Sequence, residues 1–135
     1  LYYIASGCIR LTDKDMPVKL LKLHQAILQL IDTYDPSDFV IEKVFVKKNV
    51  DSALKLGQAR GVILAAMATQ FQNNINEYSP RLVKKAITGY GAAEKSQVQL
   101  MVKSLLSLQD LPQEDAADAL ALAICHLNNH RILHA

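Results

Sequence analysis

Hydrophobic residues recur along the chain at two spacings, and segments with one spacing alternate with segments that have the other. Residues 1–10, LYYIASGCIR, are rich in β-branched and aromatic side chains and predict a strand. Residues 15–34 carry leucine and isoleucine three and four positions apart, which predicts an amphipathic helix. Residues 39–45, FVIEKVF, form a short, dense apolar run that is typical of a strand buried on both faces.

A long helix is predicted after the polar loop that follows this run. It extends over residues 52–70, with Asp51 or Ser52 as its N-cap. Gly57 and Gly61 lie four positions apart on it, so they share a face and permit the close approach of another helix. Glycine inside a helix costs about 1 kcal/mol against alanine, which favours a packing reason for the pair.

Shorter elements complete the chain. The pattern predicts a strand over residues 75–78, a brief helix opened by Ser79-Pro80 and closed by Gly89, a helix over 98–108 and a last helix after Pro112. Strands that alternate with helices indicate an α/β fold, with a mixed central sheet flanked by helices. A length of 135 residues is expected for a single domain that spans residues 1–135.

Composition excludes some classes and leaves others open. Half of the residues are hydrophobic and 21% are charged, as in an ordinary globular protein, and no apolar run approaches the roughly 20 residues that span a bilayer. Cys8 and Cys125 have no paired or metal-type spacing, and we expect reduced thiols in a cytoplasmic protein. A net charge of +2 does not by itself imply nucleic-acid binding, so the placement of the charges matters more.

Glu42 is a carboxylate inside the apolar run at residues 39–45. In a strand buried on both faces, an unpaired carboxylate costs several kcal/mol. One interpretation is a strand-end residue that faces solvent at a sheet edge. The other is a metal ligand at the carboxyl end of a central strand, where α/β proteins place their sites.

Asp115 and Asp118 open the last helix, in the stretch QEDAADALALAICH. Acids near a helix N-terminus gain roughly 0.3–1 kcal/mol from the helix dipole, which is sufficient reason for such a pair. Their spacing of three also places both carboxylates on one face, within reach of a common ion. Together with Glu42 they would form an oxygen-only ligand set that suits Mg²⁺ or Mn²⁺ and the hydrolysis of a phosphodiester with two ions.

Basic residues gather in clusters, each of which has an ordinary interpretation as a solvated face. The clusters comprise Lys43, Lys47 and Lys48 around Phe45, then Arg81, Lys84 and Lys85, and finally Lys95. Near acids that bind a metal, they indicate contacts with nucleic-acid phosphates. Phe45 is either a core aromatic or a side chain that stacks on or between bases.

The histidines do not predict a site of their own. His126, His130 and His134 lie four apart, but Asn128-Asn129 predict that the helix frays between them, so no three-histidine site is expected. His126 remains open as an additional ligand or proton carrier. His24 is expected to be a surface or hydrogen-bonded residue of its helix.

With these residues assembled, the chain resembles the RuvC family of Holliday junction resolvases in the RNase H-like superfamily. The resemblance covers nearly the whole sequence and rests on five motifs that occur in the family's order. They are SGCIR at 6–10, IEKVF at 41–45, DSALKLGQARG at 51–61, GYGAAEKSQVQ at 89–99 and DAADALALAI at 115–124.

The resemblance implies a homodimer that uses Mg²⁺ to nick two strands of four-way junction DNA symmetrically, in recombination and repair, with RuvA–RuvB as partner proteins. It implies that Glu42, Asp115 and Asp118 are three of four catalytic acids. It also implies that Phe45 inserts near the junction centre, that Lys84 and Lys95 serve DNA binding or cleavage, and that the helix with Gly57 and Gly61 lies in the region of the dimer interface.

One feature of the family is absent from the front of the chain. RuvC proteins begin with a strand similar to GIDPG, whose aspartate is the fourth catalytic acid, and we expect this strand to lie upstream of Leu1. Two other functions stay open: a junction-binding protein without cleavage activity, and another RNase H-like nuclease that acts on RNA. An upstream Asp-Pro-Gly strand would favour the junction-cutting enzyme.

Overall fold

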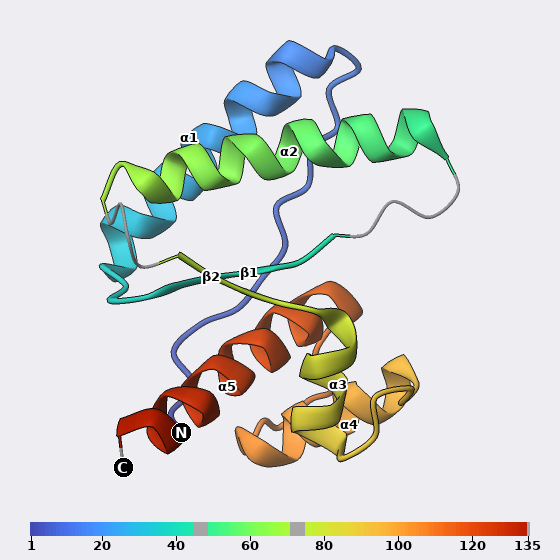
Figure 1. Cartoon of the computed structure of the whole chain (residues 1–135). Helices are drawn as coiled ribbons and strands as arrows, with labels where there is room; N and C mark the ends of the chain where they lie inside the picture. The colour runs from blue at the N-terminus through green and yellow to red at the C-terminus, as the bar shows by residue number, and fades with distance from the viewer. Residues whose placement is uncertain (45–48, 71–74, 135) are drawn as a thin grey trace. The chain divides into compact units, whose positions relative to one another are not determined.

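A computed structural model describes residues 1–44, 49–70 and 75–134 and shows helices interspersed with two short strands (Figure 1). In chain order the elements are α1 (Met16–Tyr34), β1 (Phe39–Glu42), α2 (Val50–Ala68), β2 (Ile75–Tyr78), α3 (Pro80–Thr88), α4 (Lys95–Leu105) and α5 (Glu114–His134).

The chain divides into two compact units. The first, called here the site unit, comprises Leu1–Cys8, Val40–Lys43 and Glu77–Ala135, and the second, the helical pair, comprises Ile9–Phe39 and Val44–Asn76. The compactness of each unit does not test whether they fold together, so a single domain over residues 1–135 stays a prediction.

The helical pair consists of α1 and α2, which pack against each other (Figure 1). The helix expected over 15–34 is confirmed, with Pro17 in its first turn and Asp35 at its end in the left-handed region, at φ 44°. The cap expected for α2 is wrong. Asn49, rather than Asp51 or Ser52, is the N-cap, because its side-chain oxygen accepts hydrogen bonds from the N–H groups of both residues.

β1 and β2 pair in a small parallel sheet, and the Lys43 N–H extends the pairing by donating to the Tyr78 carbonyl at 2.9 Å. β2 has the predicted bounds. Strand structure in β1 ends at Glu42, and burial falls from buried Phe39 to exposed Glu42, so burial on both faces is wrong at this end. Glu42 is the last residue of the strand and borders a cavity instead of the core.

Residues 1–10 form no strand, which corrects the prediction from their composition. A strand requires a neighbour that pairs with its N–H and C=O groups, and no backbone pairing to residues 1–10 occurs within the described ranges. Tyr2 and Ile4 remain 96% and 79% exposed. The sheet of the described residues therefore has two parallel strands, where a larger mixed sheet was expected.

The core of the site unit lies where α3, α4 and α5 pack together (Figure 1). Its buried residues are Val83 and Ile87 of α3, Val98 and Val102 of α4, and Ala121, Leu122, Ile124 and Cys125 of α5. Local signals set the bounds of α3. Ser79 Oγ accepts from the Leu82 N–H at 3.2 Å, and Gly89 ends the helix with a φ of 80°.

α5 does not fray at Asn128-Asn129 and continues to His134, which corrects the earlier expectation. Asparagine lowers helix propensity by only about 0.7 kcal/mol, whereas Ile124, Cys125 and His126 are all buried just before it. Packing of this segment therefore outweighs the local preference. Within the described ranges, no helix has the length and apolar character needed to cross a membrane.

Candidate active site

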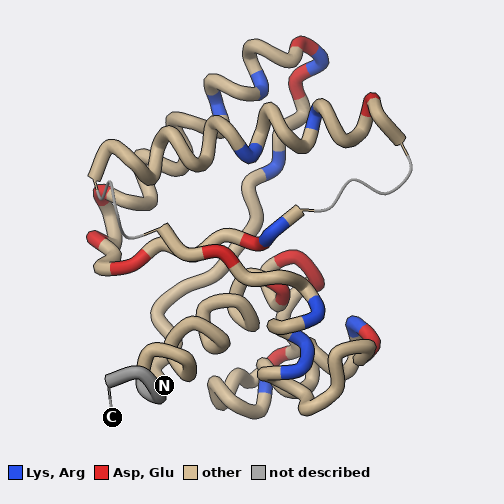
Figure 2. The backbone as a smooth tube through the Cα atoms, in the orientation of Figure 1, with Lys and Arg blue, Asp and Glu red and all other residues tan. Residues whose placement is uncertain are grey.

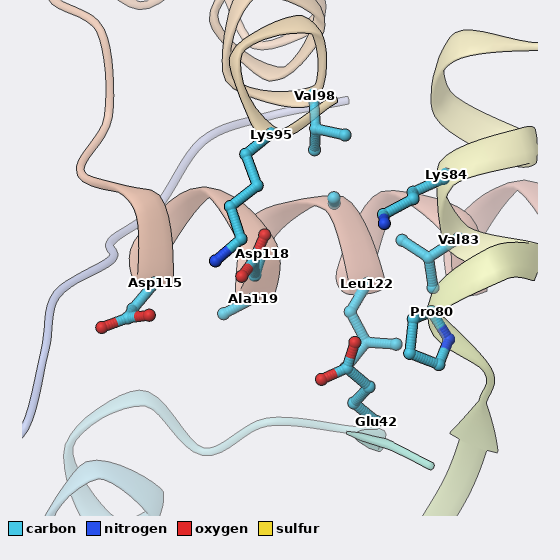
Figure 3. A pocket seen from close by; sticks show the side chains of 11 residues that line it. Glu42, Pro80, Val83, Lys84, Lys95, Val98, Asp115, Asp118, Ala119 and Leu122 are labelled. Atoms are coloured by element: carbon cyan, nitrogen blue, oxygen red, sulfur yellow. The ribbon is translucent and has the colours of Figure 1, made fainter. Parts of the chain in front are cut away.

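A cavity of about 520 Å³ opens in the site unit beside the first turns of α5 (Figure 3). Its charged lining combines three carboxylates with two ammonium groups, and its remaining lining is apolar. The lining residues are Glu42, Asp115, Asp118, Lys84, Lys95, Pro80, Val83, Val98, Ala119, Ala121 and Leu122. The structure thus brings the three predicted acids to one cavity.

Glu42 reaches the cavity from the end of β1, on the side opposite the helix that carries the aspartates (Figure 3). Partial burial raises the pKa of the Glu42 carboxyl, and the nearby charge of Asp118 raises it further. Lys84 and Lys95 act in the opposite direction, because their positive charges favour the ionised carboxylate. The net effect is a carboxylate whose negative charge is disfavoured where it lies.

The pKa of the Asp118 carboxyl is raised as well. Burial is the main cause of its raised pKa, followed among the raising causes by the charges of Asp115 and Glu114, while Lys95 and Lys84 lower the pKa. Asp115 lies three residues earlier on α5, and Figure 3 shows both carboxylates on the same cavity-facing side of the helix. The helix spacing therefore gathers like charges at this point.

Two lysines face these acids from neighbouring helices. Lys95 begins α4, extends its ammonium group toward Asp118 and lies 3.7 Å from the Glu114 carboxylate (Figure 3). Lys84 projects from α3 and lines the same cavity (Figure 3). Figure 2 shows the basic positions of α3 and the start of α4 beside the acidic positions at the start of α5.

Two of the other predicted DNA contacts lie outside the cavity lining. Arg81 and Lys85 belong to α3, whereas Phe45, Lys47 and Lys48 fall outside the described residues. The Arg81 side chain packs over Gly91: a Cβ built on Gly91 would lie 2.9 Å from Arg81 Cγ. Sequence reasoning missed this contact, because only the fold of the α3–α4 connection brings the two residues together.

The described histidines have surroundings apart from the cavity. His126 is buried, its Nδ1 shares a hydrogen bond with the Tyr78 hydroxyl at 2.8 Å, and its ring lies 5.4 Å from that of His130. His24 is partly buried and lines an apolar groove of the helical pair. Burial raises the pKa of the Cys125 thiol, which disfavours its nucleophilic form.

The donor set fits a hard divalent cation. Glu42, Asp115 and Asp118 supply oxygen ligands from two separate elements, and such ligands suit Mg²⁺ or Mn²⁺ better than zinc. The raised pKa values of Glu42 and Asp118 report like-charge crowding and burial, both of which a bound cation would offset. The same cavity presents ammonium groups that can contact a phosphate.

An α/β protein with a carboxylate-lined cavity beside lysines belongs to a class that includes metal-dependent nucleases. The family model described as crossover junction endodeoxyribonuclease RuvC matches residues 1–126. This chain belongs to the RuvC family.

Relatives and solved structures agree with this assignment. Over all 135 residues the chain is 49% identical to a Vibrio cholerae protein and 50% identical to an Aliivibrio fischeri protein, both named crossover junction endodeoxyribonuclease RuvC, and it covers 78% of each. It is similar to Thermus thermophilus RuvC alone, with a TM-score of 0.76, and in complex with a Holliday junction substrate, with a TM-score of 0.81. Both structural matches have 31% identity and cover 88% of this chain and 72% of the other. The predicted RNase H-like fold class is confirmed.

Proposed function

We propose that this protein is a metal-dependent endonuclease that resolves Holliday junctions by symmetric hydrolysis of DNA phosphodiesters. The observation that carries the proposal is the cavity shared by Glu42, Asp115 and Asp118, which Lys84 of α3 and Lys95 of α4 also line. Membership of a family whose members are named crossover junction endodeoxyribonucleases supports the choice of substrate. The solved complex of Thermus thermophilus RuvC with a Holliday junction substrate also supports it.

We propose Mg²⁺ as the natural cation, with Mn²⁺ as a substitute, held by the three carboxylates. When bound, the metal would supply an activated water and stabilise charge on the leaving oxygen. Two lysines of the cavity would act beside the bound metal. Lys95 and Lys84 would attract the scissile phosphate, and their positive charges partly offset the burial that raises the pKa values of Glu42 and Asp118.

DNA contacts would extend beyond the cavity along α3. Arg81 and Lys85 would join Lys84 in binding phosphates, which fixes the register of the junction without reading bases. Phe45 is assigned to the junction centre by family resemblance, and Lys47 and Lys48 are proposed as phosphate contacts from the basic cluster in the sequence; all three fall outside the described residues. Four-way junction DNA is therefore the proposed substrate.

The proposed assembly is a homodimer, because symmetric cutting requires two sites related by a two-fold axis. The face of α2 that carries Gly57 and Gly61 supports this assembly, since a Cβ built on either glycine meets no described atom within 4 Å. We further propose a cytoplasmic location and RuvA–RuvB as partner proteins, both from the family resemblance.

Amide substitutions in the full-length protein test the proposed chemistry. Asp118→Asn and Glu42→Gln keep the size of each side chain and remove its charge, so both should abolish junction cutting with Mg²⁺ while junction binding persists. A gel assay on a labelled four-way junction measures cutting, and mobility shift measures binding. Asp110→Asn, at an exposed acid of the loop before α5, is the matched control.

The outcomes separate the candidate functions. Cutting that survives in Asp118→Asn or Glu42→Gln would refute the metal-site assignment. A wild-type protein that binds junctions but cuts none with Mg²⁺ or Mn²⁺ would be a binding protein without cleavage activity. Faster hydrolysis of an RNA–DNA hybrid than of a junction would identify another RNase H-like nuclease.

A further inference from the structure

The side chain that caps α5 also contacts one of the three acids of the cavity. Gln113 lies directly before α5, and its Oε1 accepts a hydrogen bond from the Ala116 N–H at 3.0 Å. Its Nε2 donates to Oδ2 of Asp115 at 3.4 Å. One amide therefore satisfies a free N–H group of the helix and also holds a carboxylate.

Two donors fix the orientation of this amide. Besides the Ala116 N–H, the Cys8 thiol donates to Gln113 Oε1 at 2.9 Å. A flipped amide would turn its NH₂ group toward both donors and lose both hydrogen bonds. The network therefore directs Nε2 to Asp115.

The backbone that carries Gln113 is tied to α4. Gln99 Nε2 donates to the Pro112 carbonyl at 3.0 Å in a partly buried position. Lys95 lies one helical turn before Gln99 and projects into the cavity beside Asp118 (Figure 3). The same helix thus places a lysine in the cavity and anchors the entry to α5.

We propose that Gln113 is a positioning residue for metal binding by Asp115. Its amide engages Oδ2 and thereby restrains the carboxylate rotamer, so that the second oxygen is presented to the cation. Hydrogen bonds of this kind orient metal ligands and lower the entropic cost of binding. This inference rests on the proposed function, because it takes Asp115 as a ligand.

Gln113→Ser separates positioning from capping. Serine is a favourable N-cap that can still accept from the Ala116 N–H, but it carries no amide donor for Asp115. Gln109→Ser is the matched control, since Gln109 is an exposed amide of the same loop. Isothermal titration of the full-length protein with Mn²⁺ alone, without DNA, measures affinity independently of activity.

We expect the Kd for Mn²⁺ to be about tenfold higher in Gln113→Ser than in the wild type. This is the low end of the range for losing a side chain that orients a metal ligand, because the hydrogen bond from Gln113 to Asp115 is long and exposed. Gln109→Ser should keep the wild-type affinity, and circular dichroism should show the same helix content in all three proteins. A Kd for Gln113→Ser within about twofold of that of Gln109→Ser would overturn the proposal.

A double-mutant cycle with Asp115→Asn keeps this test distinct from that of the proposed function. In the Asp115→Asn background, Gln113→Ser should cause no further loss of Mn²⁺ affinity, whereas an undiminished second loss would overturn the positioning role. If Asp115→Asn alone leaves Mn²⁺ affinity unchanged, Asp115 is no ligand, and the proposed metal site fails together with the role of Gln113. If only Gln113→Ser is silent, the metal site stands and the positioning role is refuted.

Discussion

Asp118→Asn should stabilise the metal-free protein while it removes the response of the protein to metal. Burial and the charges of Asp115 and Glu114 raise the pKa of Asp118, so its ionised form is disfavoured in the folded state relative to the unfolded chain. Replacing the carboxylate by an amide of equal size removes that penalty. A metal ligand in the role proposed for Asp118 would therefore lower the stability of the metal-free protein.

The magnitude is modest because the Asp118 side chain is only partly buried and keeps contact with solvent, which screens its charge. Interactions between exposed charges are worth about 0.2–1 kcal/mol, and we take about 0.5 kcal/mol for the relief of repulsion. In a chain of 135 residues this corresponds to a rise in Tm of about 2 °C. Saturating Mg²⁺ should reverse the order, since a ligand at 100 times its Kd stabilises the wild type by about 2.7 kcal/mol.

Thermal melts followed by circular dichroism, with a chelator and then with Mg²⁺, measure both effects. Asp51→Asn is the matched control, because Asp51 lies in the first turn of α2 and pairs with Lys55 at 3.1 Å. Its substitution removes a favourable interaction with the helix dipole and should leave Tm unchanged or slightly lower. Asp118→Asn should thus raise Tm in chelator, whereas Asp51→Asn should not.

The pH dependence supplies a second check on the sign. The stability gap between Asp118→Asn and the wild type should be full at neutral pH. It should close as the pH falls from the raised pKa of Asp118 toward its ordinary value of 3.8, because the carboxyl is then neutral in both states. A lower Tm for Asp118→Asn in chelator would refute the reasoning and indicate that the acid is a stabilising helix-end residue.

Three further substitutions test the DNA-binding side of the proposal. Lys95→Met should reduce junction cutting more than junction affinity and lower the salt dependence of binding by about one unit of slope; an unchanged slope would exclude a phosphate contact. Gly91→Ala should displace the Arg81 side chain, since the new Cβ would lie 2.9 Å from its Cγ, and should weaken junction binding a few-fold without lowering Tm. Phe45→Ala should impair cutting more than stability, and an equal loss of both would identify a core residue.

Local chemistry made part of this fold predictable. The bounds of β2 and α3 follow from the sequence because Ser79 caps the helix through its own side chain and Gly89 ends it with a positive φ. Pairing between distant segments does not follow in this way. The strand expected over residues 1–10 was wrong, because strand formation depends on a neighbour that residue types within the segment do not specify.

In the candidate site, too, local features were predictable from the sequence, whereas contacts between distant segments were not. The helix period places Asp115 and Asp118 on one face of α5 from sequence alone. Bringing Glu42 to that face depends on how β1 packs in the site unit, which the helix period does not specify; the chemistry of the three acids and the family resemblance suggested the grouping. Gln113 escaped notice because glutamine is not among the residues that usually signal an N-cap.

Electrostatics distinguishes the two explanations for acids at the start of α5. An acid that serves only the helix dipole should find its negative charge favoured, yet the pKa of Asp118 is raised, and that of Glu42 across the cavity is raised with it. Glu114 differs, because it lies outside the cavity lining and pairs with Lys95 at 3.7 Å. Stability alone would therefore retain Glu114 and disfavour a charge at Asp118, which is the pattern that the proposed cation site predicts for its ligands.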